Sequence, residues 1–353
     1  MISTLIENIP YGVLAGFLTL LLALSLSPIA RAIGLLDQPG GRKQHKGNIP
    51  LIGGICIFMT FAATFFLASE TIPEIRWLVI STSLLLVIGI IDDYFDIRAI
   101  YKLLAQAIAA GLMMWQTGLY VDHIAYLPNG TSLQLGAWGY GLTLIGVVGM
   151  INAFNMSDGI DGLAGIQALT SSLALGAFIF ILGNELIHET YLDIFRGAIF
   201  GYLLINLSII TKRKIFLGDA GSMIIGFIVS WMVIYYSQLP ADKALPASLA
   251  PWLLILPIAD TITLIFRRIK KGQSPMRADR KHLHHILLRL GFGPRQSLYA
   301  MTLLTVILQI IGFSTYLLLG DIGAYVCFTL FVVAYYYLVT RIWRVSKFIR
   351  RLI

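Results

Sequence analysis

The sequence predicts an all-α, polytopic membrane protein that forms one integral-membrane domain over its 353 residues. Two observations carry this prediction. Hydrophobic residues make up 58% of the chain and charged residues only 12%, which is about half the charged fraction of a soluble globular protein. In addition, apolar runs of about twenty residues, the length at which a helix crosses a bilayer, recur from one end of the chain to the other.

About eleven segments are expected to cross the membrane as helices. The first has no basic region before it and no small-residue cleavage site, so we expect it to be a retained span and not a signal peptide. Cys56 and Cys327 both lie in apolar runs, which favours core packing over a disulfide or a zinc site. The predicted spans are residues 10–32, 50–69, 76–92, 99–117, 138–155, 162–183, 193–211, 219–237, 246–267, 296–319 and 322–342.

The distribution of positive charge orients these helices, because Lys and Arg concentrate in cytoplasmic loops. If the N-terminus lies outside and the C-terminus lies in the cytoplasm, 23 of the 26 Lys and Arg residues fall on the cytoplasmic side. Only Arg76, Arg196 and Lys243 then fall outside. The opposite orientation would invert this ratio, so the sequence predicts an outer N-terminus and a cytoplasmic C-terminus.

The segment 152–165, which reads NAFNMSDGIDGLAG, joins two of the predicted spans. It places two carboxamides, Asn152 and Asn155, just before two carboxylates, Asp158 and Asp161. At helical spacing, positions 152, 155 and 158 share one face. Charged groups at the end of an apolar helix are costly against lipid, so we expect these side chains to face a polar cavity.

Two further acidic motifs lie at predicted cytoplasmic ends. Asp92 and Asp93 are adjacent carboxylates, which repel each other and are best tolerated with a cation between them and their neighbours. Lys102 could face the same cavity. Asp219 begins a span among small residues and is a candidate metal ligand. Phe216, three residues earlier, could stack on a nucleotide base or anchor a membrane interface.

Basic residues fill two cytoplasmic loops. Residues 37–54 are rich in Gly, Pro and basic side chains and could hold an anion or form an ordinary positive-inside loop. The larger loop, residues 267–296, contains an apolar repeat from Leu283 to Leu290 that predicts an amphipathic helix on the membrane surface. Its three histidines could bind a transition metal or phosphate oxygens, and phosphate is favoured because the other clusters are oxygen ligands. These histidines are His282, His284 and His285.

All these clusters fall on the predicted cytoplasmic face, and their chemistry points to one reaction type. Carboxylates and amide oxygens suit Mg²⁺ or Mn²⁺, and Arg, Lys and His suit phosphates. The combination predicts metal-dependent phosphoryl transfer on a diphosphate, with a lipid as one substrate and no nucleic-acid partner. The alternative is a secondary transporter of an anionic solute, which would carry its ionisable residues near the bilayer midplane.

Taken in order, the motifs resemble those of the polyprenyl-phosphate N-acetylhexosamine-1-phosphate transferase family. This family also includes the translocase that makes the first lipid intermediate of peptidoglycan. The present histidine loop and segment 152–165 are most similar to bacterial members that act on undecaprenyl phosphate. The matching motifs are His45-Lys46, Ile49-Pro50, Gly53-Gly54, Asp92-Asp93, residues 152–165, residues 216–222, Arg267-Arg268, Ser274-Pro275, Asp279-Arg280 and His282-x-His284-His285.

The resemblance implies a reaction and its partners. GlcNAc-1-phosphate would pass from UDP-GlcNAc to undecaprenyl phosphate, with release of UMP, at the bacterial inner membrane. This is the first membrane step of O-antigen, common-antigen or related envelope polysaccharide synthesis. Mg²⁺ or Mn²⁺ would be the cofactor, another UDP-N-acetylhexosamine is the alternative donor, and a homodimer is a further expectation because related enzymes form dimers.

The resemblance also implies roles for individual residues. Asn155 and Asp219 would bind the metal. The catalytic set would be Asp92, Asp93, Asp158, Asp161, His282, His284 and His285, in which Asp92 and Asp93 position or deprotonate the lipid phosphate. The substrate-binding set would be Lys46, Lys102, Asn152, Asn206, Phe216, Arg267, Arg268 and Arg280.

Two mechanisms are compatible with these roles. A lipid phosphate monoester has a second pKa of about 6 and is largely dianionic at neutral pH, so direct attack on the sugar-bearing phosphorus needs no strong base. A covalent aspartyl-phosphate on Asp92 or Asp93 is the alternative. Direct attack is favoured.

Overall fold

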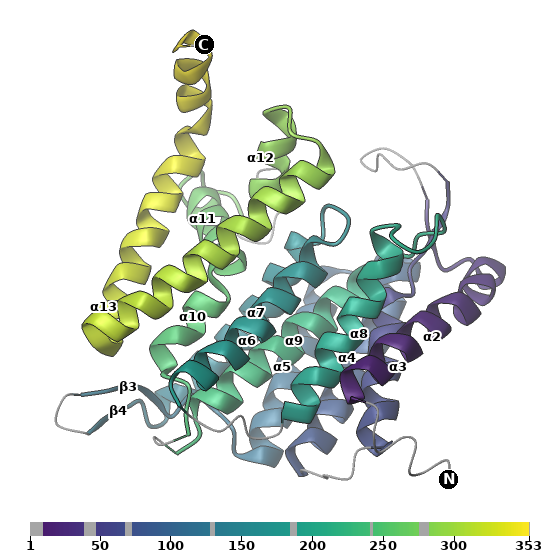
Figure 1. The fold of residues 1–353 in the computed structure, drawn as a ribbon, viewed down its shortest axis with the longest axis horizontal. Helices are drawn as coiled ribbons and strands as arrows, with labels where there is room; N and C mark the ends of the chain where they lie inside the picture. Colours follow the sequence, from purple (N-terminus) through teal and green to yellow (C-terminus); the bar gives the residue numbers. More distant parts are fainter. Residues whose placement is uncertain are drawn as a thin grey trace.

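The computed structural model of the chain describes residues 10–38, 47–67, 73–127, 131–183, 189–240, 243–274 and 282–352. Long helices lie roughly side by side and form a single bundle (Figure 1). The helices are α2 (Tyr11–Ile33), α3 (Gly53–Leu67), α4 (Pro73–Phe95), α5 (Ala99–Thr117), α6 (Trp138–Ser157), α7 (Leu163–Ile181), α8 (Glu189–Asn206), α9 (Gly218–Ser237), η1 (Ala247–Leu249), α10 (Ala250–Leu253), α11 (Ile255–Ile269), α12 (Leu283–Arg289) and α13 (Pro294–Leu352).

Two loops form short antiparallel strand pairs, which the all-α prediction did not include. β1 (Leu36–Asp37) pairs with β2 (Ile49–Pro50), and β3 (His123–Tyr126) pairs with β4 (Ser132–Gln134). The β3–β4 pair projects from the end of the bundle opposite to α12 (Figure 1). Strand pairing gives hydrogen-bond partners to backbone groups of loops that would otherwise lack them. The bundle is therefore helical as predicted, but two of its connections are partly extended.

Among the described residues, six helices are long and apolar enough to cross a membrane. A bent pair, Ala247–Leu253 and Ile255–Ile269, turns by 77° and would bring the number to seven. The chain is therefore a multi-pass membrane protein. Every one of the eleven predicted spans has a helical counterpart, but α3, α5 and α8 are shorter or more polar than an independent span. Eleven spans and their orientation stay predictions.

The last two predicted spans correspond to a single helix, α13, which has a break inside it. Gly320 interrupts α13 with φ 68° and ψ −168°, a backbone conformation that only glycine adopts without strain. The two arms of α13 fold back on each other at this point (Figure 1). The predicted segments 296–319 and 322–342 correspond to these two arms.

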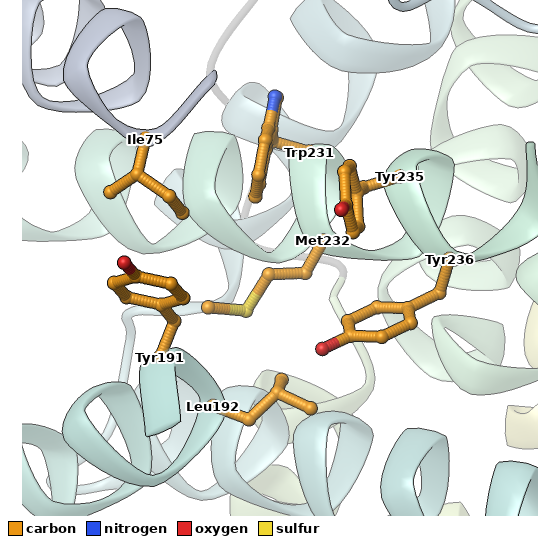
Figure 2. Close-up of a pocket in the computed structure, with 7 residues that line it drawn as sticks. All are labelled: Ile75, Tyr191, Leu192, Trp231, Met232, Tyr235 and Tyr236. Atoms are coloured by element: carbon orange, nitrogen blue, oxygen red, sulfur yellow. The ribbon is translucent and has the colours of Figure 1, made fainter. Parts of the chain in front are cut away.

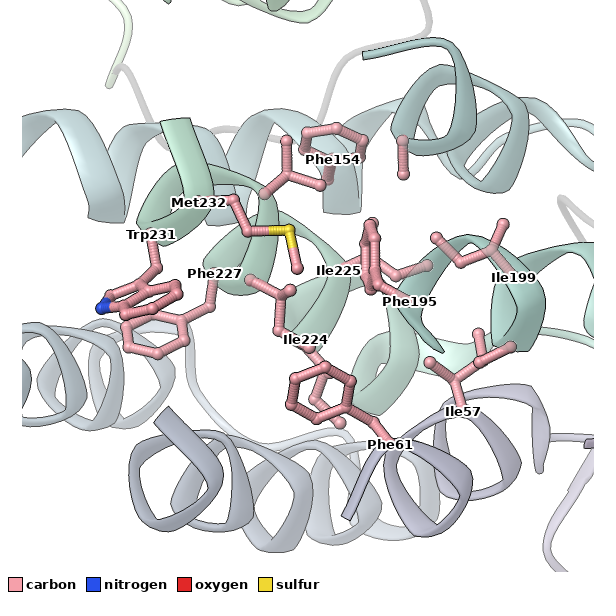
Figure 3. Packing of buried hydrophobic residues seen from close by; sticks show 14 of the residues in the cluster. Ile57, Phe61, Phe154, Phe195, Ile199, Ile224, Ile225, Phe227, Trp231 and Met232 are labelled. Atoms are coloured by element: carbon pink, nitrogen blue, oxygen red, sulfur yellow. The ribbon is translucent and has the colours of Figure 1, made fainter. Parts of the chain in front are cut away.

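Helix α9 is the centre of the bundle. It is apolar on every side and almost entirely buried, as expected for a helix enclosed by other helices. Figure 3 shows its side chains packed against those of α3, α6 and α8. The labelled residues are Ile224, Ile225, Phe227, Trp231 and Met232 of α9, Ile57 and Phe61 of α3, Phe154 of α6, and Phe195 and Ile199 of α8.

A small cavity lies near the C-terminal half of α9, away from the polar clusters predicted above. Apolar and aromatic side chains surround it (Figure 2). It therefore offers no charged group that would recognise a phosphate or a metal. Its lining residues are Ile75, Tyr191, Leu192, Trp231, Met232, Tyr235 and Tyr236.

Helices α2 and α8 pack closely through glycines spaced four residues apart. A Cβ atom added to Gly197 would lie 1.9 Å from the carbonyl oxygen of Gly12, and one added to Gly201 would lie 2.4 Å from that of Gly16. Small residues at this spacing allow two helix backbones to approach inside a membrane. The packing explains why both helices carry glycine here.

We expect Gly197→Ala to destabilise the bundle by about 2 kcal/mol or more, because the new methyl group must displace backbone atoms of α2. The measurement is the apparent melting temperature of the purified protein in detergent. Gly111→Ala on α5 is the matched control, since nothing lies within 4 Å of a Cβ at that position. Equal melting temperatures for the two variants would contradict the close approach of α2 and α8.

Candidate active site

The predicted polar clusters meet at one end of the bundle, where α4 and α6 end and α5, α7 and α9 begin. This is the end that also carries α12 (Figure 1). The alternation of helix directions brings these termini together. The enclosed helix α9 places its first turn in the middle of them.

Asp93 of α4 caps the first turn of α9. Leu217, the residue before α9, offers no capping side chain. Instead, the Asp93 carboxylate accepts hydrogen bonds from the backbone N–H groups of Asp219 (2.8 Å) and Ala220 (3.3 Å). A carboxylate at this position satisfies unpaired N–H groups and complements the helix dipole. Gly218 must lack a side chain, since its Cβ would lie 2.5 Å from Asp93 Oδ2.

Lys102 of α5 joins two carboxylates. Its ammonium donates to Asp92 Oδ2 at 2.6 Å and to Asp219 Oδ2 at 2.9 Å. Asp92 is 6% exposed, and its other oxygen accepts the backbone N–H of Ile97 at 3.0 Å. Asp92, Lys102 and Asp219 therefore form an ion chain that links α4, α5 and α9, and its charges alternate in sign.

The two asparagines of α6 lie beside this ion chain. Asn155 donates to the Ser222 hydroxyl at 2.9 Å, and Ser222 donates to the backbone carbonyl of Asp219 at 3.2 Å. Asn152 donates to Gln106 Oε1 at 2.7 Å. The predicted helical spacing is thus confirmed for 152 and 155, which lie in α6 and contact neighbouring helices on one face. The nitrogen of Asn155 is engaged, so its carbonyl oxygen is the atom suited to a cation.

Asp158 and Asp161 lie in the turn between α6 and α7. The helix ends at Ser157, so Asp158 lies beyond the face it was predicted to share. Asp161 forms an ion pair with Lys214 from the loop before α9. Burial, followed by the negative charges of Asp219 and Asp93, raises the pKa of Asp158 to about 8. Without a bound cation, this carboxyl group is therefore mainly protonated at neutral pH.

The raised pKa makes Asp158 a source of instability at high pH. Its ordinary pKa is 3.8, so between pH 3.8 and 8 the native state holds a proton that the unfolded state has lost. Stability then falls as pH rises through this window. We expect Asp158→Asn, in EDTA, to melt several degrees above the wild type at pH 8.5 and to match it near pH 4. A difference that does not grow with pH would contradict this assignment.

His284 faces the same turn from α12. It is 1% exposed, and neither ring nitrogen has a hydrogen-bond partner among the described residues. A Cβ atom on Gly159 would lie 2.1 Å from His284 Nε2, so the ring lies directly against the backbone of the turn. Burial, followed by the neighbouring His285 and His282, lowers the pKa of His284 to about 3. His284 is therefore a neutral ring at physiological pH.

The amphipathic helix is present as α12, but its apolar face packs against protein. Leu283 and Ile286 are buried in a cluster with Leu163 of α7, Leu256 of α11 and Leu298 of α13. Because protein already covers this apolar face, it is not available to a bilayer. The helix instead presents its histidines to the turn after α6.

The remaining predicted site residues lie in the loop before α9, near the end of α11, in α12, or outside the described residues. Phe216 joins two loops through its backbone: its N–H donates to Pro50 at 2.8 Å, and its carbonyl accepts from Gly53 at 2.8 Å. Asn206 is buried and donates to the carbonyl of Ile215 at 2.9 Å, which fixes the same loop. Near the end of α11, Arg268 is buried and Arg267 is half-buried, and His285 of α12 is half-buried too. Lys46 and Arg280 lie outside the described residues.

Comparison with known proteins identifies the family. A family model described as glycosyl transferase family 4 matches residues 75–237, the stretch from α4 to α9 that holds the ion chain. A relative from Yersinia pestis is 37% identical over 92% of this chain and 89% of its own. A relative from Escherichia coli is 36% identical over 92% of this chain and 88% of its own. A relative from Haemophilus influenzae is 35% identical over 96% of this chain and 95% of its own. The chain belongs to glycosyl transferase family 4. All three relatives are named undecaprenyl-phosphate alpha-N-acetylglucosaminyl 1-phosphate transferase.

Membership of this family makes the chain a membrane-embedded transferase, as its motifs predicted, and sets aside the transporter alternative. The family-4 site also contains residues that the sequence did not single out. Asp37 is buried in β1 and contributes to the raised pKa of Asp158. Lys214 pairs with Asp161, and Gln106 holds Asn152. Lys214 stands five residues before Asp219, a proximity that could have identified it.

The donor set of this family-4 site fits a divalent cation. Within the described ranges, no three His, Cys, Asp or Glu side chains converge to hold a metal by themselves. Mg²⁺, however, is usually bound by one or two carboxylates together with substrate phosphates. The Lys102 ammonium between Asp92 and Asp219 shows that the site stabilises a positive charge. The Asn155 carbonyl oxygen is a hard donor of the type that Mg²⁺ and Mn²⁺ prefer.

Proposed function

We propose that this transferase moves GlcNAc-1-phosphate from UDP-GlcNAc to undecaprenyl phosphate and releases UMP. The ion chain of Asp92, Lys102 and Asp219 carries the proposal, because it concentrates cation-binding and anion-binding groups at one point. The names of relatives that align over about nine-tenths of the chain support the same substrates. The reaction would occur at the bacterial inner membrane, as the first step of an envelope polysaccharide such as O-antigen or common antigen.

Asp219 and Asn155 are the residues we assign to Mg²⁺ or Mn²⁺. When bound, the cation would neutralise the diphosphate and stabilise the charge that develops on departing UMP. Lys102 lies against Asp219 and would contribute a second positive charge to the same phosphates. The protonated state of Asp158 relieves repulsion among the carboxylates until a cation or a substrate is present.

The contacts of Asp92 and Asp93 favour direct attack over a covalent intermediate. Both oxygens of Asp93 accept N–H groups of α9, and both oxygens of Asp92 are hydrogen-bonded. Neither carboxylate offers an unengaged oxygen as a nucleophile. In direct attack, an oxygen of the lipid phosphate bonds to the sugar-bearing phosphorus, and the bond from that phosphorus to the bridging oxygen breaks. The bridging oxygen and its electron pair leave with UMP.

Substrate anions would be held by the surrounding basic and polar groups. Lys214 can exchange its pair with Asp161 for a phosphate, because both partners are about one-third exposed. His284 of α12 lies against the turn after α6, and Arg267 and Arg268 lie near the end of α11. Asn206 and Phe216 set the shape of the loop before α9, and Phe216 remains the candidate for stacking on uracil.

A donor-competition assay tests the proposal. The purified protein in micelles would be given undecaprenyl phosphate, Mg²⁺ and one of UDP-GlcNAc, UDP-GalNAc or UDP-MurNAc-pentapeptide, and UMP release would be followed. We expect lipid-dependent release with UDP-GlcNAc only. Release with another donor and none with UDP-GlcNAc would overturn the donor assignment. Recovery of a phospho-aspartyl enzyme after UDP-GlcNAc alone would overturn direct attack.

A further inference from the structure

Asp260 is a buried carboxylate that the reaction described above does not use. It lies in α11 and is only 5% exposed. Three groups from two other elements meet it. His282 Nδ1 lies 2.8 Å from Oδ2, while the backbone N–H of Leu283 (3.1 Å) and the hydroxyl of Tyr335 (3.1 Å) donate to Oδ1. A buried charge is costly unless it is fully hydrogen-bonded, and here the carboxylate is.

These contacts fix the start of α12. His282 precedes the helix and provides no side-chain cap of its own. Asp260 supplies the cap from α11 by accepting the N–H of Leu283, the first residue of α12. Tyr335 of α13 anchors the same carboxylate from the far side. One side chain therefore joins the start of α12 to α11 and α13.

The contacts also determine which nitrogen of His282 carries its proton. A carboxylate accepts hydrogen bonds, so Nδ1 must donate and the proton resides there. Nε2 is then the ring nitrogen that Asp260 does not hold, and a proton taken up there would create a cation compensated by Asp260. This is the orienting role that a buried carboxylate has beside a functional histidine in other enzymes.

The orientation of His282 also bears on the turn after α6, because His284 lies between the two. The rings of His282 and His284 are nearly parallel, with centroids 5.7 Å apart and an interplanar angle of 10°. His284 in turn lies against Gly159, between Asp158 and Asp161. A change at Asp260 would therefore move the histidines relative to the carboxylates of the active site.

We propose that Asp260 is a positioning residue of the transferase, which sets the tautomer and orientation of His282 and holds α12 against the turn after α6. The inference rests on the proposed function in one respect, namely that His282 acts on substrate phosphates. The charge on those phosphates shifts to UMP in the transition state, so a compensated His282 cation stabilises the transition state more than the bound substrates. Loss of Asp260 then lowers kcat more than it raises KM.

The test is Asp260→Asn in the full-length protein. The Asn oxygen can still accept from Leu283 and Tyr335, but its NH₂ group faces His282 and forces Nδ1 to become an acceptor. We expect kcat for UMP release to fall about 10- to 100-fold with KM for UDP-GlcNAc within about threefold. With ¹⁵N-labelled histidine, the His282 signal, assigned by its loss in His282→Gln, should change from the Nδ1–H to the Nε2–H tautomer.

Asp321→Asn is the matched control. Asp321 is also a buried aspartate of the bundle, 8% exposed, which accepts a backbone N–H from Tyr126 at 3.0 Å and the hydroxyl of Ser248 at 2.5 Å. It lies at the β3–β4 end, far from α12. We expect a comparable loss of melting temperature without a loss of kcat. If both variants lose kcat equally, the effect of Asp260 is only structural and the proposal fails.

The outcomes separate this inference from the proposed function. If the wild type releases no UMP but shows the Nδ1–H tautomer of His282, and Asp260→Asn reverses it, the proposed function fails and the positioning role stands. If the wild type is active and Asp260→Asn changes neither kcat nor the tautomer, the positioning role fails alone. If Asp260→Asn does not fold, the tautomer of His282 in the wild type decides. Protonation on Nε2 only would overturn the inference, and protonation on Nδ1 would support it.

Discussion

Asp219→Ala is expected to lower metal-dependent turnover by at least about 1,000-fold, because it removes both the proposed metal ligand and one partner of Lys102. The helix itself should persist, since Asp93 caps α9 through the backbone N–H of residue 219, which alanine retains. Two measurements check this: UMP release at saturating Mg²⁺, and the number of Mn²⁺ ions bound per protein by electron paramagnetic resonance. Both should fall together while the melting temperature stays within a few degrees.

A matched control for Asp219→Ala is Asp122→Ala. Asp122 is an acidic residue beside β3, at the opposite end of the bundle, where it accepts a hydrogen bond from Tyr120 at 3.3 Å. Its replacement removes the same charge from the protein without touching the ion chain. Turnover near the wild-type level in Asp219→Ala would refute the metal assignment, and an equal loss in Asp122→Ala would show that net charge alone is responsible.

The second large effect is expected for Gly159→Ala, which should reduce kcat about 10- to 100-fold by pushing His284 away from the turn after α6. The added methyl group would lie 2.1 Å from Nε2 and 2.7 Å from Cε1 of the imidazole ring. The ring is only 1% exposed and has little room to rotate, so we expect α12 to shift with it. Steady-state UMP release measures the loss.

Two further variants make the test of Gly159 specific. Gly149→Ala, in α6, has nothing within 4 Å of the new methyl group and should keep full activity. His284→Ala removes the clash, so Gly159→Ala should cost little when it is added to His284→Ala. Additive losses in this double-mutant cycle would mean that the two residues do not act on each other.

The sequence predicted the helices well because hydrophobic length is a local property. Each predicted span overlaps helical residues, although the last two share α13, and Asp92, Lys102 and Asp219 do meet as expected from motifs at span ends. Asp93 shows the limit of that reasoning. Adjacent carboxylates predicted two similar roles, but neighbouring residues of a helix point in different directions, so Asp93 caps α9 while Asp92 binds Lys102. Only the packing of α4 on α9 distinguishes the two.

The features that the sequence did not predict depend on contacts between segments far apart in the chain. Leu283 and Ile286 predicted an amphipathic face correctly, but hydrophobic periodicity does not say whether lipid or protein covers it. Asp260 lies 22 residues before His282, inside an apolar helix, and nothing local relates the two. Asp37 and Lys214 likewise come near the site only through the pairing of β1 with β2 and the closure of the loop before α9.

The enclosure of α9 has a consequence for biogenesis. The first turn of α9 receives Asp93 from α4, Lys102 from α5 and Asn155 from α6, all of which precede it in the chain. A newly made α9 would expose apolar side chains to lipid until those earlier helices close around it, with α3 and α8 completing the enclosure. The catalytic centre therefore assembles late, at the moment of enclosure, and the onset of activity during synthesis would report completion of the bundle.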